Sequence, residues 1–197
     1  MTPAAFAGIA VALFMAELTD KDALLLLALA TRTRPLKVFL AGAAAFALTT
    51  FVIVTAGSYA IAVIPVLWIK LVGGLVMLSY GAWKARGAIG QMAVEEGENR
   101  VTEGGGDLKA FLMMVGTLVL LDLAGDATEV LTVVFVAQYS NSLLVFSSAY
   151  AGLLSATALE TALGKGLGRI LTPRRIRYVS MAVFLVLGAS IVASSLW

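Results

Sequence analysis

Continuous apolar runs constrain this chain more than any other feature of its sequence. Six of them approach or exceed the roughly 20 residues that an α-helix needs to cross the hydrocarbon core of a bilayer. The composition agrees, because 60% of the 197 residues are hydrophobic and only 13% are charged, too few to give a soluble domain of this size a charged surface. The predicted spans are Ala4–Ala30, Val38–Ala60, Val66–Trp83, Lys109–Ala137, Leu143–Leu163 and Tyr178–Leu196.

These runs predict helices. Inside a bilayer every backbone polar group must be satisfied within the protein, and a helix does this within one segment. An outer-membrane barrel would instead show alternating polarity, which these runs lack. The expected fold class is therefore an all-α integral membrane protein with six transmembrane helices.

The two halves of the chain repeat one another. A shift of 107 residues lays one half on the other at several places, and an odd number of helices per half requires the copies to insert with opposite orientation. We therefore predict a first three-helix repeat at 1–83, a polar linker at 84–108 and a second, inverted repeat at 109–197. The matching pairs are 36–39 with 143–146, Gly57 with Gly164, Lys70 with Arg177, and 81–82 with 188–189.

The basic residues predict the orientation. Twelve of the fourteen lie in the first, third and fifth connections, which all fall on one side of the membrane; only Lys70 is on the other side, and Lys21 is inside a helix. By the positive-inside rule that side is cytoplasmic. The prediction is a multi-pass protein of the cell (plasma) membrane, with the central linker in the cytoplasm and both termini outside.

Seven acidic residues lie inside the predicted membrane helices. An ionised group at bilayer depth costs at least about 2.5–3.5 kcal/mol on insertion scales, so such groups face a protein interior or a watery cavity. A purely structural alternative is an internal network of ion pairs that joins helices. The helices hold six more acids than bases, however, so such a network would leave most of the carboxylates without a counter-charge. The seven are Glu17, Asp20, Asp22, Asp122, Asp126, Glu129 and Glu160.

Helical spacing groups most of these acids. In a regular fourth helix, Asp122, Asp126 and Glu129 fall at i, i+4 and i+7, within about 60° of arc. Because the first and fourth helices are equivalent members of the repeats, an inverted arrangement brings their acidic faces together near the pseudo-symmetry axis.

The first helix carries the matching face. Glu17, Asp20 and Lys21 share one side of a regular helix, and Asp22 points about 100° away unless the helix is broken there. Lys21 has two interpretations, a fixed counter-ion or a group that changes partners during transport. Glu160 also has two: it joins the cluster or carries protons, or it lies near the interface and pairs with Lys165.

The segments 16–22 (AELTDKD) and 123–128 (LAGDAT) resemble a paired signature. The family is that of the small Ca²⁺/Mn²⁺:H⁺ antiporters of the lysine-exporter superfamily, which includes Golgi manganese/calcium transporters and bacterial manganese exporters. Its signature, E-x-G-D-K/R-S/T, occurs once in each three-helix repeat. The resemblance covers essentially the whole chain and implies six helices, a central acidic loop and divalent cation/proton exchange.

This chain departs from the signature in both copies. In the first, Glu17, Asp20 and Lys21 match, whereas Thr19 replaces glycine and Asp22 replaces the hydroxyl residue. In the second, Gly125, Asp126 and Thr128 match, whereas Leu123 stands at the glutamate position and Ala127 at the basic one. The chain therefore resembles a divergent member, in which Asp122 and Glu129 lie beside the lost positions.

The ligand types favour hard cations. The chain has no histidine and no cysteine, and oxygen donors suit Ca²⁺, Mn²⁺ or Mg²⁺. We predict a Ca²⁺ or Mn²⁺/proton antiporter, not an enzyme, with no permanently bound cofactor. The expected metal ligands are Glu17, Asp20, Asp122, Asp126 and Glu129, with hydroxyl oxygens of Thr19 and Thr128; Lys21, Asp22, Gly125 and Glu160 are secondary candidates.

Two other classes stay open at this point. A Na⁺-coupled carrier or a cation channel would use the same acids. An intramembrane aspartyl protease would use two aspartates, for which Gly125-Asp126 is the only suggestion. The expected partners are the lipid bilayer, divalent cations and protons, with no nucleic acid; a homodimer is left open.

Overall fold

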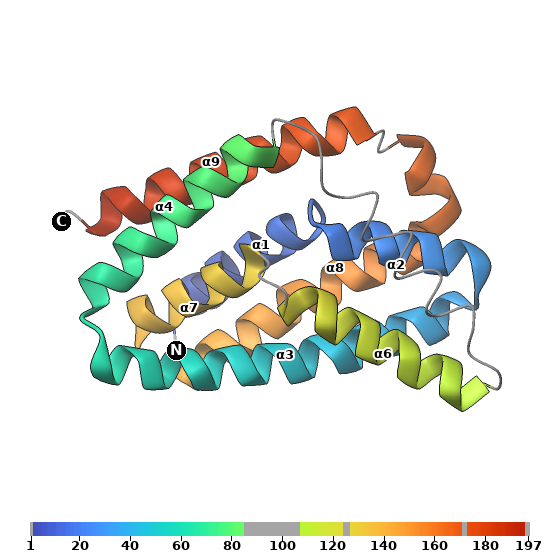
Figure 1. Cartoon of the computed structure of the whole chain (residues 1–197), viewed down its shortest axis with the longest axis horizontal. Helices are drawn as coiled ribbons and strands as arrows, with labels where there is room; N and C mark the ends of the chain where they lie inside the picture. The colour runs from blue at the N-terminus through green and yellow to red at the C-terminus, as the bar shows by residue number, and fades with distance from the viewer. Residues whose placement is uncertain (1, 85–106, 124–126, 171–172, 196–197) are drawn as a thin grey trace.

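The computed structural model describes residues 2–84, 107–123, 127–170 and 173–195, apart from the side chains of 84, 165–170, 173–177 and 180. The predicted linker at 84–108 lies outside the described residues except at its ends. The described parts form helices joined by short turns (Figure 1). The helices are α1 (Pro3–Glu17), α2 (Lys21–Arg32), α3 (Pro35–Val63), α4 (Val66–Lys84), α6 (Asp107–Leu123), α7 (Ala127–Tyr139), α8 (Ser142–Ile170) and α9 (Pro173–Ser195).

The prediction of continuous helices at Ala4–Ala30 and Lys109–Ala137 is wrong, because each of these spans is broken near its middle. The axes of α1 and α2 differ by 68°, and those of α6 and α7 by 65°. At the first break Asp20 is extended (φ −95°, ψ 177°), and its side chain accepts a hydrogen bond of 2.7 Å from the backbone N–H of Lys21. Aspartate is a preferred N-cap, so it starts a new helix inside the apolar run.

Length and composition support most of the predicted membrane crossings. In the described residues, stretches of α3, α4 and α8 are long and apolar enough to cross a membrane, and each broken pair qualifies when it is counted as one span. The described apolar stretch of α9, Met181–Ser195, is shorter. Helix α9 as a whole has 23 residues, however, which at about 1.5 Å per residue is enough to cross the core.

The two halves have the same helices in opposite directions. In Figure 1, α1, α2 and α4 run from left to right, whereas their counterparts α6, α7 and α9 run from right to left. Helix α3 begins at Pro35 and α8 at Ser142, an offset of 107 residues, while α1 ends at Glu17 and α6 at Leu123, an offset of 106. The repeat is therefore inverted. The offset grows by one residue between the helix break and the start of the long helix α3 or α8.

Contacts between equivalent residues mark the pseudo-two-fold axis. A side-chain atom added to Gly81 on α4 would meet Leu185 on α9, and one added to Gly188 on α9 would meet Leu78 on α4. Both pairs are related by the 107-residue offset, so the contact is reciprocal. On α8, the hydroxyl of Tyr150 donates to the carbonyl oxygen of Ala43 on α3, the residue 107 positions earlier.

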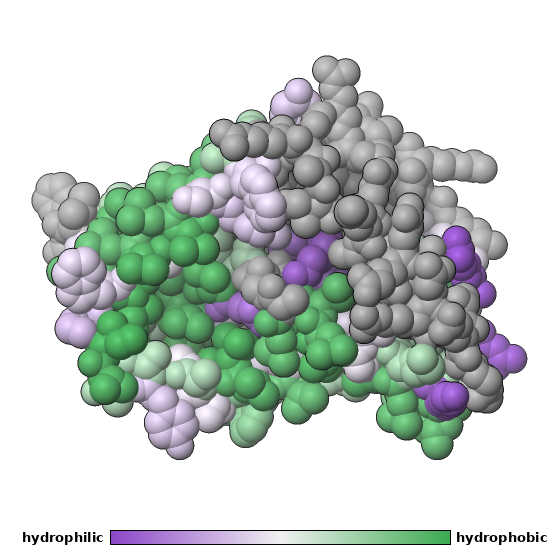
Figure 2. Space-filling view, in the orientation of Figure 1, coloured by the Kyte–Doolittle hydropathy of each residue, from purple (hydrophilic) through white to green (hydrophobic). Residues whose placement is uncertain are grey.

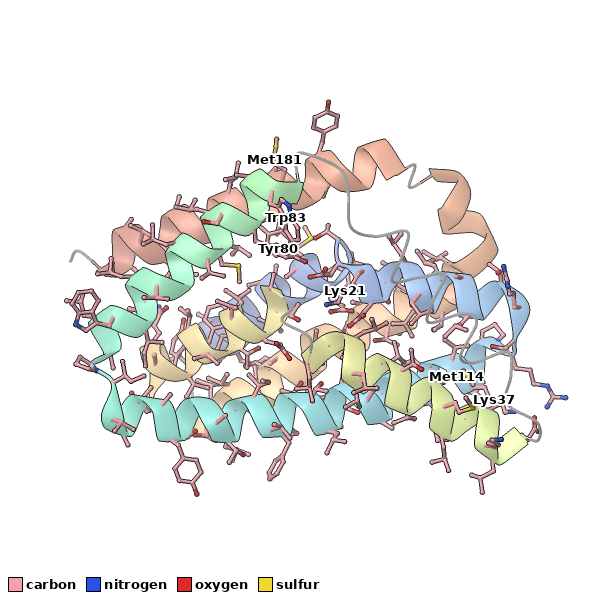
Figure 3. The ribbon with its side chains drawn as sticks, in the orientation of Figure 1. Lys21, Lys37, Tyr80, Trp83, Met114 and Met181 are labelled. Carbon is pink, nitrogen blue, oxygen red and sulfur yellow. The ribbon has the colours of Figure 1, made fainter. Side chains whose placement is uncertain are left out.

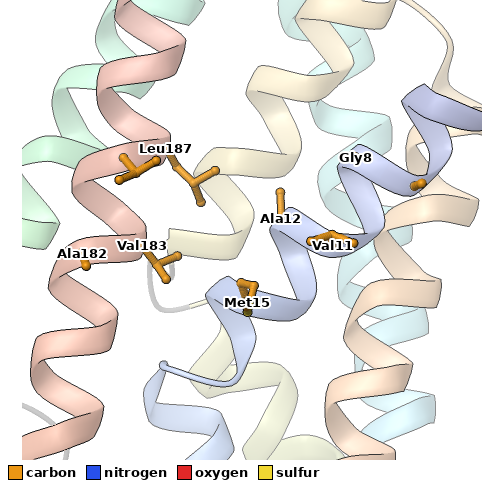
Figure 4. Close-up of a pocket in the computed structure, with 9 residues that line it drawn as sticks. Gly8, Val11, Ala12, Met15, Ala182, Val183 and Leu187 are labelled. Atoms are coloured by element: carbon orange, nitrogen blue, oxygen red, sulfur yellow. The ribbon is translucent and has the colours of Figure 1, made fainter.

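The symmetry is imperfect where the α4–α9 pair meets the rest of the bundle. Helix α4 packs along α7, whereas α9 lies loosely against α1. An apolar groove of about 670 Å³ separates α9 from α1 there (Figure 4). It is lined by Ala7, Gly8, Val11, Ala12, Met15, Ala182, Val183, Val186 and Leu187.

Large apolar side chains cover much of the described surface, as expected for a surface in contact with lipid. Leu36, Tyr59, Val63 and Leu143, for example, are each about 70–80% exposed. Figure 2 shows this apolar surface, with hydrophilic side chains at one end of the molecule and visible between the apolar helices near its centre.

Candidate functional site at the two helix breaks

The first break gathers acids that the sequence placed on different faces of one helix. Glu17 is the last residue of α1, Asp20 caps α2, and Asp22 lies in the first turn of α2. All three side chains are at most 1% exposed. Because the helix turns at Leu18–Asp20, Asp22 is buried beside the others, and the prediction that Asp22 points away holds only for an unbroken helix.

The second break is less acidic among the described residues. Asp122, near the end of α6, is 3% exposed, and Glu129, in the first turn of α7, is half-buried. These two residues lie on different helices, so the predicted single face for them is wrong for the same reason as in the first half. Gly125 and Asp126 lie outside the described residues.

Acids of both halves meet at the centre of the bundle. Glu17 is close enough to Glu160, Asp22, Asp122 and Asp20 for their charges to act on it. Helix α8 contributes Glu160, which is fully buried and whose charge acts on Glu17, so the structure brings it near the acids of the first break.

Lys21 lies at this centre in Figure 3, at the start of α2. Its positive charge acts on Asp22 of its own half and on Asp122 of the other. Among the described residues Lys21 is thus the one base that acts on these acids, and it offsets only part of their charge.

Two hydrogen-bonding side chains were missed by the sequence reasoning. The hydroxyl of Tyr80 on α4 donates to Oδ1 of Asp20 at 3.0 Å, and its ring packs edge-on against that of Phe184 on α9, with centroids 5.1 Å apart. Thr49 on α3 lies beside the carboxyl group of Asp122, and its hydroxyl donates to the carbonyl oxygen of Ala45 at 3.2 Å. In the sequence both look like ordinary residues of apolar helices, and only the adjacent pair Thr49-Thr50 gives a weak polar signal.

Several buried oxygens have no hydrogen-bond partner among the described residues. They include both carboxyl oxygens of Glu17, Asp22 and Glu160, and the hydroxyl oxygen of Thr128. Thr19 differs, since its hydroxyl donates to the carbonyl oxygen of Ala16 at 2.9 Å. Buried polar groups are normally paired, so these carboxyl oxygens indicate a place for a ligand that the described residues do not supply.

In this conformation no three acidic side chains within the described ranges form a group that could hold one metal ion. The acids are instead distributed around the two breaks. A complete coordination shell would have to include groups beyond these side chains, such as Asp126, backbone carbonyl oxygens at the helix ends, or water.

Comparison with protein families decides the identity. A model of the family "divalent cation/proton antiporter GDT1" matches residues 5–92 and 110–196. The chain belongs to the GDT1 family. The comparisons with curated proteins and with solved structures gave no match.

The GDT1 match confirms the resemblance in the paired signature. It covers both halves separately, in agreement with the internal repeat seen in the helices. This GDT1 family member is therefore a multi-pass membrane transporter and not an enzyme, and its transported substrates are divalent cations and protons.

Proposed function

We propose that the chain exchanges Ca²⁺ or Mn²⁺ for protons through the carboxylates at its two helix breaks. The observation that carries this proposal is that Glu17 and Asp22 of one half lie within charge range of Asp122 of the other, all three buried inside membrane helices. The proposed ligands are Glu17, Asp20, Asp122, Asp126 and Glu129. No permanently bound cofactor is needed for this chemistry.

The same oxygens serve both substrates. A carboxylate in a dry environment binds either a proton or a metal ion, so the arrival of the metal displaces protons. The end of a half-helix helps, because its last carbonyl groups carry partial negative charge, and Glu17 is at the C-terminal end of α1. The unpaired hydroxyl of Thr128 offers one more oxygen. The hydroxyl oxygen of Thr19 can also coordinate a metal ion while its proton is donated to the carbonyl oxygen of Ala16.

Alternating access follows from two opposed halves that pack unequally. The α4–α9 pair is joined by close glycine contacts and lies against α7 on one side, with the apolar groove towards α1 on the other. In the proposed cycle this pair shifts across the groove. The movement transfers access to the acids from one membrane face to the other.

We place the central linker in the cytoplasm and export the cation from there across the plasma membrane. The basis is the asymmetry of basic residues, including Arg32, Arg34 and Lys37 around the end of α2 and the start of α3. The chain has no cysteine, so a single Gly105→Cys variant can be labelled without background. Reaction of this cysteine with an impermeant reagent added outside intact cells would contradict the orientation.

Reconstitution in liposomes tests the exchange itself. Wild-type protein, with a pH dye inside the vesicles, should release protons when Ca²⁺ or Mn²⁺ is added and give no signal with Na⁺. Asp20→Asn and Asp126→Asn keep the side-chain size and remove a charge that metal and proton both need, so exchange should fall by about 100-fold or more. Full metal-driven proton release by the Asp126→Asn protein would overturn the mechanism.

A further inference from the structure

Glu160 is a buried acid that the paired signature does not explain. It lies on α8, its side chain is fully buried, and neither carboxyl oxygen has a hydrogen-bond partner among the described residues. At the equivalent position of α3, 107 residues earlier, stands Ile53. A lone carboxyl group in this place serves no packing purpose, because an isoleucine fills the corresponding place in the other half.

The packing of α8 on α1 sets Glu160 beside Glu17. The two helices run in the same direction (Figure 1) and cross where Gly152 meets Ala10, so closely that a Cβ on Gly152 would overlap the carbonyl oxygen of Ala10. At about 1.5 Å per residue, both glutamates lie about 10–12 Å beyond this crossing. Glu160 is accordingly among the acids whose charges act on Glu17.

The positive and hydrogen-bonding groups nearby are directed to other acids. Lys21 acts on Asp22 and Asp122, and Tyr80 donates to Asp20. The charges that act on Glu17 within the described residues are all acidic. Glu17 and Glu160 thus present four buried oxygens with no donor in the described part of the chain, and burying such a pair of charges without compensation is strongly unfavourable.

We propose that Glu160 is a ligand of the transported divalent cation, which it holds together with Glu17 between α1 and α8. The second signature has Leu123 where the family has glutamate, and Glu160 restores the number of carboxylates from a different helix. Two carboxylates and retained water molecules make a suitable shell for Mn²⁺ or Ca²⁺. This inference rests on the proposed function, since it assumes that the first break holds the transported cation.

Metal binding by the purified full-length protein tests the role of Glu160 without transport. Mn²⁺ affinity is measured by calorimetry, and the rise in melting temperature on adding Mn²⁺ is measured in parallel. Glu160→Gln should weaken Mn²⁺ binding by about tenfold or more and remove most of the rise in melting temperature. Glu160→Asp, which keeps the charge but shortens the side chain, should lose a few-fold in affinity.

Ser148→Ala is the matched control. Ser148 is a buried polar residue of the same helix. Among the described residues its hydroxyl donates to the carbonyl oxygens of Leu144 and Val145 of its own helix, so its loss should leave Mn²⁺ affinity unchanged. Wild-type affinity in the Glu160→Gln protein would overturn the inference, and so would a change confined to the pH dependence of exchange. If Glu160→Gln does not fold, unchanged affinity in Glu160→Asp overturns it.

The two proposals fail in different ways. Wild-type protein that binds Mn²⁺ but exchanges no protons contradicts the proposed function. Wild-type exchange together with normal Mn²⁺ binding by Glu160→Gln leaves the proposed function intact and rejects only the role of Glu160.

Discussion

The two helix breaks are equivalent by symmetry and differ in what surrounds them. The first is lined by acids of its own, by Tyr80 from α4 and by Glu160 from α8. In the other half the positions of Tyr80 and Glu160 are taken by Leu187 and Ile53, which are apolar. Tyr80 and Glu160 are therefore polar additions to the first break, whereas Thr49, whose counterpart is Ala156, is a polar addition beside Asp122 at the second.

The helix packing differs in the same sense. Helices α1 and α8 approach so closely that a Cβ on Gly152 would overlap the backbone of Ala10. The residue equivalent to Ala10 in the other half, 106 positions later, is Gly116 on α6. A Cβ on Gly116 would meet no atom within 4 Å. The comparison teaches that the two halves share one scaffold, whereas charge and tight packing are concentrated around the first break, where α8 of the second half contributes Glu160 and Gly152. We infer that the first break contributes more to cation binding than the second.

Asp22 and Glu129 give the largest expected difference. Both lie in the first turn of the helix after a break, but Asp22 is fully buried near Asp122 and Glu129 is half-buried. Asp22→Asn should lower metal-driven proton release in liposomes by about tenfold or more, equivalent to about 1.4 kcal/mol of binding. Glu129→Gln should have a smaller effect, because Glu129 is only half-buried and a partly exposed charge interacts more weakly with its neighbours. Equal losses would remove the distinction between the halves.

Gly152 and Gly116 test the difference in packing. Gly152→Ala places a methyl group against the backbone of Ala10 and should destabilise the protein by about 1–3 kcal/mol. Gly116→Ala meets open space and should change stability by at most about 1 kcal/mol, in the stabilising direction. Unfolding in mixed detergent measures both, and similar losses for the two variants would show that α1–α8 is not the tighter crossing.

Tyr80 tests the polar contact that the second half lacks. Tyr80→Phe removes the hydrogen bond to Asp20 and should weaken Mn²⁺ binding by about three- to tenfold, since a hydrogen bond to a charged group contributes about 1.5–3 kcal/mol and part of this is recovered by rearrangement. Tyr59→Phe is the control, because Tyr59 is 73% exposed. Calorimetry in detergent distinguishes the two, and unchanged binding in Tyr80→Phe would mean that Asp20 is held by other groups.

The ion pair of Lys37 and Asp107 gives the smallest expected effect. It joins the start of α3 to the start of α6 at the hydrophilic end of the molecule, and the carboxyl group of Asp107 is 90% exposed. Exposed ion pairs contribute little and are screened by salt. Asp107→Asn should leave both the melting temperature and the exchange rate unchanged within error. A clear loss of exchange would indicate that this end of the molecule also takes part in the difference between the halves.

Much of the fold could be predicted because it depends on patterns along the chain. Apolar length predicts membrane helices wherever backbone polar groups must be satisfied without water, and the repeated motifs with an odd number of helices predict the inverted halves. The acids were identifiable for the same reason: charge inside an apolar run is unfavourable, so Glu17, Asp20, Asp22, Asp122 and Glu160 stand out without any structure.

The helix breaks lay at the limit of what the sequence indicates. Asp20 is a good N-cap, but a capping residue within an apolar run also fits an unbroken helix, and only the packed bundle settles which one forms. This choice decides the site. In an unbroken helix Asp22 would point away from Glu17, whereas the bend of 68° brings the two side chains together.

The sequence by itself determined the membrane class, the two halves and the acids that no bilayer tolerates alone. The tertiary structure alone decided which acids face each other, through contacts between residues far apart in the chain. Tyr80 reaches Asp20 across 60 positions, and Glu160 meets Glu17 only because Gly152 lets α8 approach α1. Local pattern fixes what each helix must bury, whereas the closeness of two helices depends on the size of side chains on both.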